Sequence, residues 1–299
     1  LKKFLYTSYI LTTMLIKDKT IKREIILEII SSIKQKKELN SISDEFVQNQ
    51  LYEYLIKNTK AVPYLTKPKS KEYKLIVKEI RSILRRVYGL FRSGEETKKR
   101  KELVDSLNSV SSQKTIITQI LETHSSTKER LTIYDKLYTK IFTITKKPKT
   151  IIDLGSGINP FSVPLMKLKE LKYYAYDISQ EEMDSLNTFF TFLHTKNSQF
   201  KGKAEMLDLL HFSTLPKADI CFLFKMTDVL DKGKGHTTTE EIVKRIPSKF
   251  VVISFATRTM SGKKMTAPRR KWMEWMCTRL QYKYTIIEFP NEIFYVIEK

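Results

Sequence analysis

The feature that most constrains the fold is residues 150–160, a short apolar run followed by two closely spaced glycines. The run contains three large aliphatic residues and favours a buried strand. Gly155 and Gly157 allow the backbone to turn sharply and to approach a ligand with no Cβ in the way. Asn159 is expected to cap a helix whose first residue is Pro160, because proline needs no N–H there. A strand, a glycine turn and a helix start together are typical of a nucleotide-binding site.

An acidic residue ends the next expected strand. Asp177 closes the run 173–177 and lies 24 residues after Asp153, where a carboxylate would accept hydrogen bonds from both ribose hydroxyls. The dinucleotide fingerprint requires a third glycine, near a pyrophosphate, at the position that Pro160 occupies. The pattern therefore favours a nucleoside ligand without a pyrophosphate over the alternative, NAD. S-adenosylmethionine (SAM) is the common ligand of that kind and is the predicted cofactor.

From about residue 121 onward, strands and helices are expected to alternate, which is typical of a parallel sheet with helices on both faces. An amphipathic helix is expected at 131–142, and further helices between the first five strands. The last two strands are joined only by residues 290–292, which predicts a hairpin. The predicted fold is α/β, a Rossmann-like class I SAM-dependent methyltransferase domain with a mostly parallel seven-stranded sheet and a C-terminal antiparallel hairpin. The expected strands are 150–154, 173–177, 205–207, 219–224, 250–255, 285–289 and 293–297.

The N-terminal part has apolar residues at helical spacing. It predicts an all-helical domain over residues 1–110, followed by the methyltransferase domain over residues 111–299. The clearest helix covers residues 72–92 and has an apolar face and a basic face. The basic residues of this helix that we expect to bind RNA are Lys74, Lys78, Arg81, Arg85 and Arg92.

The charge of the chain is strongly positive. Its net charge is +21 and its pI about 9.7, and residues 60–101 alone hold 14 basic and 4 acidic residues. Clustering of one sign on a helix, opposite an apolar face, favours phosphate binding over an ordinary solvated face. An anionic membrane would attract the same basic stripe, but the apolar stripe is narrow and is needed to pack the domain itself. We therefore expect the helical domain to bind RNA.

The chain carries few residues for redox or metal chemistry. Cys221 and Cys277 are its only cysteines, and with four scattered histidines they form neither a disulfide framework nor a zinc site. Residues 4–16 form an apolar run that is too short to span a membrane and lacks a cleavage site, so a first helix is expected rather than a signal peptide. We expect a cytoplasmic monomer that holds no metal and does not contact a membrane.

Further cofactor contacts are predicted from charged residues near the expected strands. Asp208 follows the third strand, where it would accept a hydrogen from the adenine amino group; a helix cap or a surface acid is the alternative. Lys128 or Arg130 would hold the methionine carboxylate. Glu129 would orient Arg130, or all three would form a charged helix face, and their spacing does not decide between these interpretations.

The segment after Phe224 lacks the Asn/Asp-Pro-Pro-aromatic motif that enzymes methylating exocyclic amines often carry. This absence favours an acceptor such as guanine N7, whose free lone pair needs no general base, so that catalysis would depend on positioning. Lys225 and Arg258 are predicted to hold guanine O6 or a phosphate in that role. Surface charge is the alternative interpretation.

Aromatic and basic residues alternate after the fifth expected strand, as suits RNA bases and phosphates. Phe255 is predicted to stack on a flipped-out base. Trp272 and Trp275 are instead expected in the core, because they can share a helix face with methionines. The basic residues expected to contact RNA here are Lys263, Lys264, Arg269 and Arg270.

Four segments together resemble the aminoglycoside-resistance 16S ribosomal RNA (guanine-N7) methyltransferases. They are 124–130 (HSSTKER), 153–160 (DLGSGINP), 254–259 (SFATRT) and 291–297 (NEIFYVI), and the similarity covers residues 70–299. The resemblance implies a SAM-dependent enzyme of rRNA processing and antibiotic resistance that methylates guanine N7 in the decoding site of the assembled small subunit. It also implies a helical RNA-binding domain in front of a Rossmann-like domain.

The resemblance further implies which residues contact the cofactor and the target. Lys225 and Arg258 resemble the family's target-nucleotide residues, and Phe224 would lie beside the adenine. The implied SAM contacts are Phe91, His124, Ser125, Ser126, Thr127, Lys128, Glu129, Arg130, Gly155, Ser156, Gly157, Asp177, Ile178, Asp208, Leu209 and Phe224.

The chain departs from the family pattern in four places. The family commonly has Ala-Cys at Gly155-Ser156, Pro at Ala256 and Thr-Leu-Pro at residues 226–228, and its Gly-rich basic loop after Arg258 is rearranged here. These departures indicate a distant, archaeal-type relative. They also keep two alternatives open: an RNA-binding module without turnover, and a methyltransferase that acts on another RNA or on protein.

Overall fold

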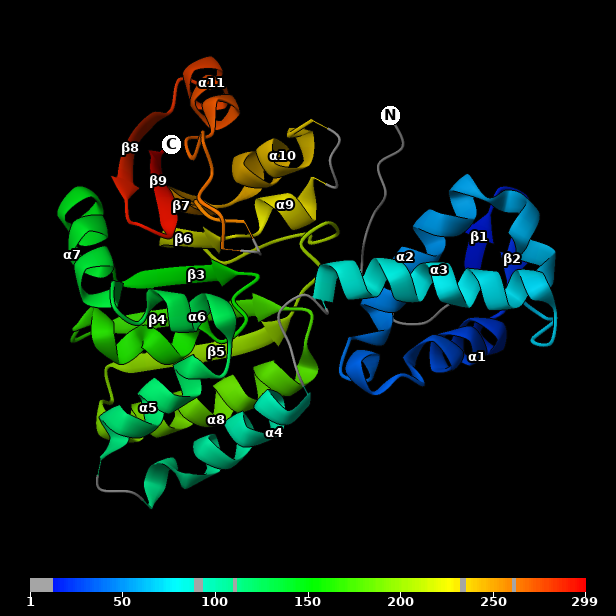
Figure 1. The fold of residues 1–299 in the computed structure, drawn as a ribbon, viewed down its shortest axis with the longest axis horizontal. Helices are drawn as coiled ribbons and strands as arrows, with labels where there is room; N and C mark the ends of the chain where they lie inside the picture. Colours follow the sequence, from blue (N-terminus) through cyan, green and yellow to red (C-terminus); the bar gives the residue numbers. More distant parts are fainter. Residues whose placement is uncertain (1–12, 89–93, 110–111, 232–234, 260–261) are drawn as a thin grey trace. The chain divides into compact units, whose positions relative to one another are not determined.

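The chain divides into two compact units, Leu1–Glu95 and Glu96–Lys299, in the computed structural model shown in Figure 1. The sequence analysis assigns residues 96–110 to the first domain, but Val104 and Leu107 are buried in the core of the second unit. The boundary therefore lies before residue 96 and not at residue 110. The structure describes residues 13–88, 94–109, 112–231, 235–259 and 262–299.

The first unit is mainly helical, but it begins with a short antiparallel hairpin that the sequence analysis does not predict. The hairpin turns at Lys17, whose φ of 54° is left-handed, so the expected first helix is absent from the part of residues 4–16 that the structure describes. The elements of this unit are β1 (Met14–Ile16), β2 (Lys19–Ile21), α1 (Arg23–Lys34), η1 (Lys37–Leu39), α2 (Asp44–Lys57), η2 (Thr59–Tyr64) and α3 (Lys71–Tyr88).

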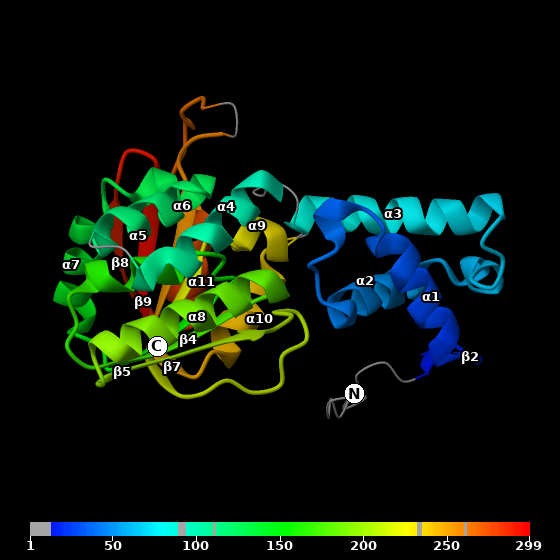
Figure 2. The ribbon, with the colours of Figure 1, turned by 90° about the horizontal axis from the view of Figure 1, so that it is seen from below.

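Helix α3 packs against α1 and α2, as Figure 2 shows. Its apolar face is buried, with Tyr73, Ile76, Ile80 and Leu84 all nearly inaccessible. Helix α1, which contacts α3, buries four of its isoleucines. The two-faced helix predicted from the sequence is therefore present over the described part of its range.

The second unit is built on a seven-stranded sheet with the order β5-β4-β3-β6-β7-β9-β8. Strands β3 to β7 run parallel, and β9 runs antiparallel to both β7 and β8. The predicted fold class is thus confirmed. The strands are β3 (Thr150–Leu154), β4 (Leu171–Asp177), β5 (Phe200–Met206), β6 (Ala218–Phe224), β7 (Ser248–Ala256), β8 (Lys283–Glu288) and β9 (Glu292–Glu298).

Strand β5 begins five residues before its predicted start at Glu205. It is an edge strand, and its lysines at positions 201 and 203 point to solvent, so the sequence lacks an apolar run there. The connections also differ from the prediction, because no helix joins β5 to β6, and a 3₁₀ segment, η5 (Asn159–Met166), follows β3. Pro164 lies inside η5 and cannot donate the backbone hydrogen bond of a regular helix.

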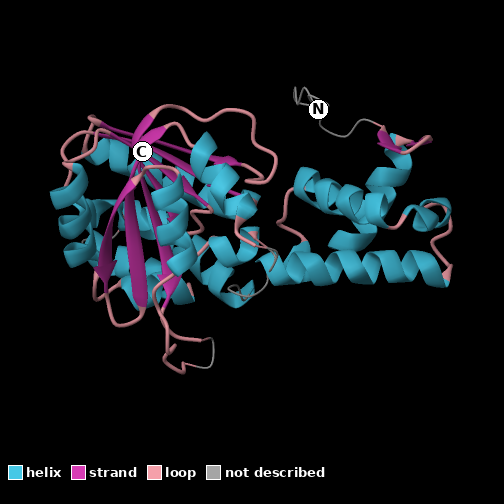
Figure 3. Cartoon of the chain, turned by 90° about the horizontal axis from the view of Figure 1, so that it is seen from above, coloured by secondary structure: helices cyan, strands magenta, loops and turns pink. Residues whose placement is uncertain are grey.

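Helices cover both faces of this sheet (Figure 3). Side chains of α5, α7 and α8 form a core on one face, and those of α9, α10 and α11 form a core on the other. The predicted helix 131–142 corresponds to α7, which begins at Tyr134. Within the described ranges, no helix has the length and apolarity needed to cross a membrane. The remaining elements are α4 (Gly94–Asp105), η4 (Ser106–Asn108), α5 (Gln113–Glu122), α6 (Ser125–Arg130), α7 (Tyr134–Thr145), α8 (Gln180–Lys196), α9 (Thr227–Leu230), α10 (Thr237–Arg245) and α11 (Lys271–Arg279).

Candidate active site

The glycine turn after β3 and the acid after β4 form one hydrogen-bonded unit. The backbone N–H of Gly157 donates to Asp177 Oδ2 at 2.8 Å, and the N–H of Ile178 donates to Asp177 Oδ1 at 2.7 Å. Ser156 N–H donates to the Tyr176 carbonyl at 3.0 Å. The structure therefore brings together the residues that the sequence analysis predicts for a ribose-binding site, and it fixes the Asp177 carboxylate in place.

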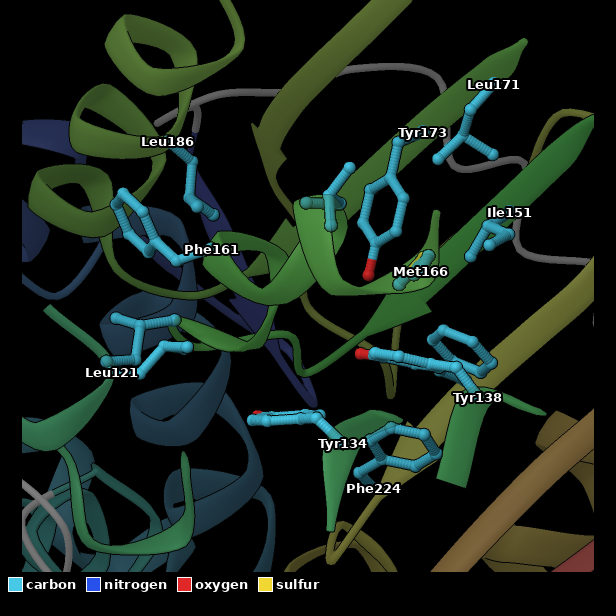
Figure 4. Packing of buried hydrophobic residues seen from close by; sticks show 14 of the residues in the cluster. Leu121, Tyr134, Tyr138, Ile151, Phe161, Met166, Leu171, Tyr173, Leu186 and Phe224 are labelled. Carbon is cyan, nitrogen blue, oxygen red and sulfur yellow. The ribbon is translucent and has the colours of Figure 1, made fainter. Parts of the chain in front are cut away.

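A buried polar cluster around Asp153 stabilises the glycine turn. Asp153 Oδ2 accepts hydrogen bonds from Asn159 Nδ2 at 2.9 Å and from the Tyr173 hydroxyl at 2.7 Å. Tyr134, which stacks on Tyr138 in the core of Figure 4, donates to Asn159 Oδ1 at 3.0 Å. Burial raises the pKa of Asp153 to about 6. The predicted helix cap at Asn159 is wrong, because the residue at the cap position of η5 is Ile158. The Asn159 side chain donates its hydrogen bond to Asp153 instead.

Gly155 has a packing role that differs from its predicted one. A Cβ at this position would lie 2.4 Å from Met226 Sδ, and φ is +65°. The side chain that follows β6 therefore also requires a glycine here, and the close approach of a ligand to Gly155 stays a prediction. The neighbouring Ser156 Oγ is buried and has no hydrogen-bond partner among the described residues. It is a polar atom that a bound cofactor could satisfy.

Asp208 lies at the same edge of the sheet, since the Leu207 N–H beside it donates to the Asp177 carbonyl at 2.9 Å. Its Oδ1 accepts the N–H of Leu210 at 3.0 Å, and its Oδ2 lies 2.7 Å from His211 Nδ1. No helix begins in the described residues 207–217, and only 7% of the Asp208 side chain is exposed, so neither the helix-cap nor the surface-acid interpretation fits. Leu209 is buried beside it, and an adenine contact by either residue stays a prediction.

The motif 124–130 forms the short helix α6 and divides into inward and outward residues. His124 Nδ1 lies 2.9 Å from Ser126 Oγ, and the buried Thr127 hydroxyl bonds the carbonyls of Leu121 and His124. The outward, exposed residues are Ser125, Lys128 and Glu129. The inward residues of the motif therefore stabilise the local turn, and its outward residues expose polar groups to solvent.

Arg130, the last residue of the motif, binds a carboxylate of the chain itself. Its Nε and Nη2 each donate to Glu292 at 2.8 Å, and both side chains are nearly inaccessible. The guanidinium also lies 4.9 Å from the ring centroid of Phe224. The sequence analysis proposed the methionine carboxylate as the partner of Arg130 and did not select Glu292. An acidic residue at the start of the apolar strand 293–297 was the available signal.

Lys225 stands at the end of β6 in a left-handed conformation with φ of 55°. Its N–H donates to Ser254 Oγ at 3.1 Å. Its Nζ lies 2.7 Å from Glu129 Oε2 and 3.6 Å from Glu292 Oε2. Ser254 Oγ donates in turn to Glu292 Oε1. Glu292 therefore orients Arg130 and Lys225 together, while Glu129 pairs with Lys225 and does not orient Arg130.

Arg258 follows β7, the neighbour of β6 in the sheet. Its Nε donates to Asn291 Oδ1 at 2.9 Å, and its Nη1 donates to the Gly262 carbonyl at 3.0 Å. Lys263 and Lys264 are exposed in the same loop. The two cations predicted to hold the target nucleotide thus follow adjacent strands; Asn291 bonds Arg258, and Glu292 pairs with Lys225.

One prediction for the RNA surface, that for Phe255, and one for the core, that for Trp275, are wrong. Phe255 is 2% exposed and packs edge-on against Trp272 and Tyr295, so its ring cannot stack on a base. Arg270 donates to the carbonyls of Pro268 at 2.9 Å and Ala256 at 3.2 Å, and these bonds stabilise the loop between β7 and α11. Trp275 is 70% exposed and does not lie in the core. Arg269 is exposed and pairs with Glu274 at 2.9 Å.

In the first unit, two of the predicted RNA-binding arginines have internal partners. Arg81 donates to the carbonyls of Ser32 and Ile33 at the end of α1, at 2.6 and 3.0 Å. Arg85 binds Glu38 through Nη2 at 2.7 Å. Lys74 and Lys78 are exposed. The side chains of Phe91 and Arg92 lie outside the described residues.

The family model for ribosomal RNA methyltransferase (FmrO) matches residues 70–296. A 16S rRNA (guanine(1405)-N(7))-methyltransferase of Proteus mirabilis is 26% identical over 204 residues, which span 64% of this chain and 71% of that protein. The enzyme of the same name from Micromonospora rosea is 29% identical over 185 residues, which span 60% of this chain and 64% of that protein.

Solved structures share the fold. The 16S rRNA methyltransferase RmtF in complex with S-adenosyl-L-homocysteine has a TM-score of 0.72 at 20% identity and covers 92% of this chain and 98% of its own. The 16S rRNA methylase ArmA has a TM-score of 0.51 at 25% identity and covers 67% and 97%. Because the family model matches well over half of its residues, the chain belongs to the ribosomal RNA methyltransferase (FmrO) family.

Proposed function

We propose that the chain transfers a methyl group from SAM to N7 of a guanine in the decoding region of 16S rRNA, acting on small subunits in the cytoplasm as a monomer. The observation that carries the proposal is the placement of Lys225 and Arg258 after adjacent strands, both in contact with the 291–292 turn. The names of the curated relatives, and the S-adenosyl-L-homocysteine bound in RmtF, support the reaction and the cofactor.

The residues of the glycine turn fit SAM. The N–H groups of Gly157 and Ile178 hold the Asp177 carboxylate in place, and carboxylate oxygens are acceptors of the kind that ribose hydroxyls need. Ser156 Oγ is buried beside them without a partner among the described residues. Asp177, Ser156 and the exposed polar groups of α6 are therefore the residues that would hold the cofactor. When bound, SAM supplies a methyl group on a positively charged sulfur.

The chain's own residues would act by positioning. Guanine N7 attacks through its free lone pair, so that no proton has to be removed. In this proposal no carboxylate or hydroxyl acts on the guanine as a base. The cations Lys225 and Arg258 would donate hydrogen bonds to guanine O6 or to a phosphate. The ion pairs of Lys225 with Glu129 and Glu292 hold its ammonium group at the end of β6. Orientation of this kind supplies on the order of 7–11 kcal/mol in favourable cases.

Variants separate cofactor binding from methyl transfer. We expect Lys225→Ala and Arg258→Ala to bind SAM with the wild-type affinity by calorimetry and to lose methyl transfer to small subunits about 100-fold, because the target base is no longer held in place. Lys201→Ala, an exposed lysine on the edge strand β5, is the matched control and should be fully active. Full activity in both site variants would refute the positioning role. SAM binding by the wild type without any transfer would favour an RNA-binding module instead.

A further inference from the structure

Helix α11 exposes an aromatic side chain that its own packing does not use. Trp275 is 70% exposed, the highest value among the large hydrophobic side chains of the described residues. The helix is anchored by its other face, where Met273, Met276 and Cys277 are buried. Trp275 is therefore not needed to pack α11 against the core.

The contrast with the second tryptophan of the same helix is informative. Trp272 stacks on His236, with ring centroids 3.7 Å apart and an interplanar angle of 10°, and it meets the edge of Phe255. Trp272 thus fills the predicted core role. Trp275, three residues later, is exposed, while Trp272 packs against the core.

Two cations flank Trp275 on the exposed face. Lys271 and Arg279 lie four residues before and after it, a spacing that places all three on one side of the helix. Both are exposed, as is Thr278 between them. We call Lys271, Trp275, Thr278 and Arg279 the outer α11 face. It contains two positive charges and no acidic residue.

Two acidic residues, Glu274 of α11 itself and Glu240, which pairs with Arg279, are already paired. Glu274 bonds Arg269 at 2.9 Å and points toward Tyr295. Glu240, on α10, pairs with both Lys244 and Arg279. One carboxylate shared between two cations leaves a positive excess beside Trp275. A flat aromatic ring between cations suits an unpaired nucleotide, whose base stacks and whose phosphates attract the charges.

The outer α11 face also lies near the candidate active site along the chain. Helix α11 follows the loop after β7 directly, and Arg270 ties its start to the end of that strand by donating to the Ala256 carbonyl. At 1.5 Å per residue, Trp275 is about 6 Å along the axis from the first residue of the helix. A nucleotide held there would belong to the same bound RNA.

We propose that the outer α11 face is a second RNA-contact surface, on which Trp275 stacks on an unpaired base while Lys271 and Arg279 contact flanking phosphates. The proposal rests on the proposed function, because it requires ribosomal RNA as the partner. It extends the RNA surface beyond the cations at the ends of β6 and β7.

The test measures binding of purified small ribosomal subunits to Trp275 variants, together with methyl transfer. We expect Trp275→Leu to raise the Kd for subunits about tenfold, because base stacking is lost, and Trp275→Phe to stay near the wild type. The melting temperature and SAM affinity of both variants should be unchanged. Leucine as good as phenylalanine would indicate an apolar protein contact and would overturn the proposal, as would wild-type Kd values for both.

Charge gives a second, independent readout. Lys271→Gln should lower the slope of log Kd against log salt concentration by about 1, which corresponds to the loss of one phosphate contact. Lys136→Gln, on the exposed side of α7, is the matched control and should leave the slope unchanged. Equal slopes for both variants would contradict the phosphate contact. If the wild type transferred no methyl group, the proposed function would fail, whereas unchanged binding in the α11 variants would fail only this inference.

Discussion

Arg130 and Glu292, 162 residues apart in the sequence, form a two-bond ion pair with both distances at 2.8 Å and with 3% and 1% of their side chains exposed. The pair joins the end of α6 to the start of β9. Through Glu292 it also reaches Lys225 and Ser254. The geometry of the target side of the site therefore depends on one buried carboxylate.

Replacing that carboxylate should be costly. Glu292→Gln keeps the shape but leaves the Arg130 guanidinium buried without its counter-charge, so we expect the free energy of unfolding to fall by about 3–5 kcal/mol. Urea denaturation measures this. The double variant Arg130→Met with Glu292→Leu removes both charges and should regain most of the stability while methyl transfer stays impaired. An additive double variant would show that the two residues are not coupled.

Asp153 predicts a pH dependence of stability. Burial raises its pKa in the folded protein to about 6, above the value of 3.8 expected for the unfolded chain. Between these values the folded state holds a proton that the unfolded state has lost, so the contribution of Asp153 is full below pH 4 and is lost as pH rises through 6. The expected decrease is about 3 kcal/mol.

The isosteric Asp153→Asn variant tests this dependence, since an amide oxygen can still accept from Tyr173. Its free energy of unfolding, measured at several pH values from 4 to 7, should lack the decrease seen in the wild type. Parallel curves for the two proteins would show that Asp153 does not titrate in this range.

Gly155 should not tolerate a side chain. A Cβ there meets Met226 Sδ at 2.4 Å and the backbone is left-handed, so Gly155→Ala should lower the free energy of unfolding by about 1–3 kcal/mol. Gly235→Ala is the matched control, because it has a similar φ of +53° and no atom within 4 Å. Adding Met226→Ala should relieve the difference between the two variants. Equal losses at both glycines would assign the effect to backbone strain alone.

A second buried ion pair lies under the cofactor side of the site. Arg100 donates to Glu182 Oε1 and to Thr123 Oγ1, both at 2.9 Å, and a Cβ on Gly157 would lie 3.9 Å from Glu182 Oε2. We expect Arg100→Met to destabilise the fold by about 3 kcal/mol and to weaken SAM binding measured by calorimetry. Lys98→Met, exposed on the same helix, should change neither. Unaltered SAM affinity would restrict Arg100 to a structural role.

The sequence predicts the second unit well because its signals are local. The run 150–154, the glycine turn and Asp177 each follow from neighbouring residues, and the structure brings them together. The roles of Glu292 and Arg100 are not predicted, since their partners lie far away in the sequence; an acid at the start of the apolar strand 293–297 does not by itself identify a partner. The prediction for Phe255 is wrong for a related reason. Whether a strand residue faces a helix or a ligand depends on which helix packs on the strand, and here Trp272 of α11 packs on Phe255.

The account is tested most directly by incubating purified small subunits with the protein and SAM labelled in its methyl group, and mapping the product by mass spectrometry of nuclease fragments. The account predicts one N7-methylguanosine in the decoding region of 16S rRNA. Labelled RNA with the methyl group on another atom or in another region, or no incorporation by a protein that binds SAM, would contradict it.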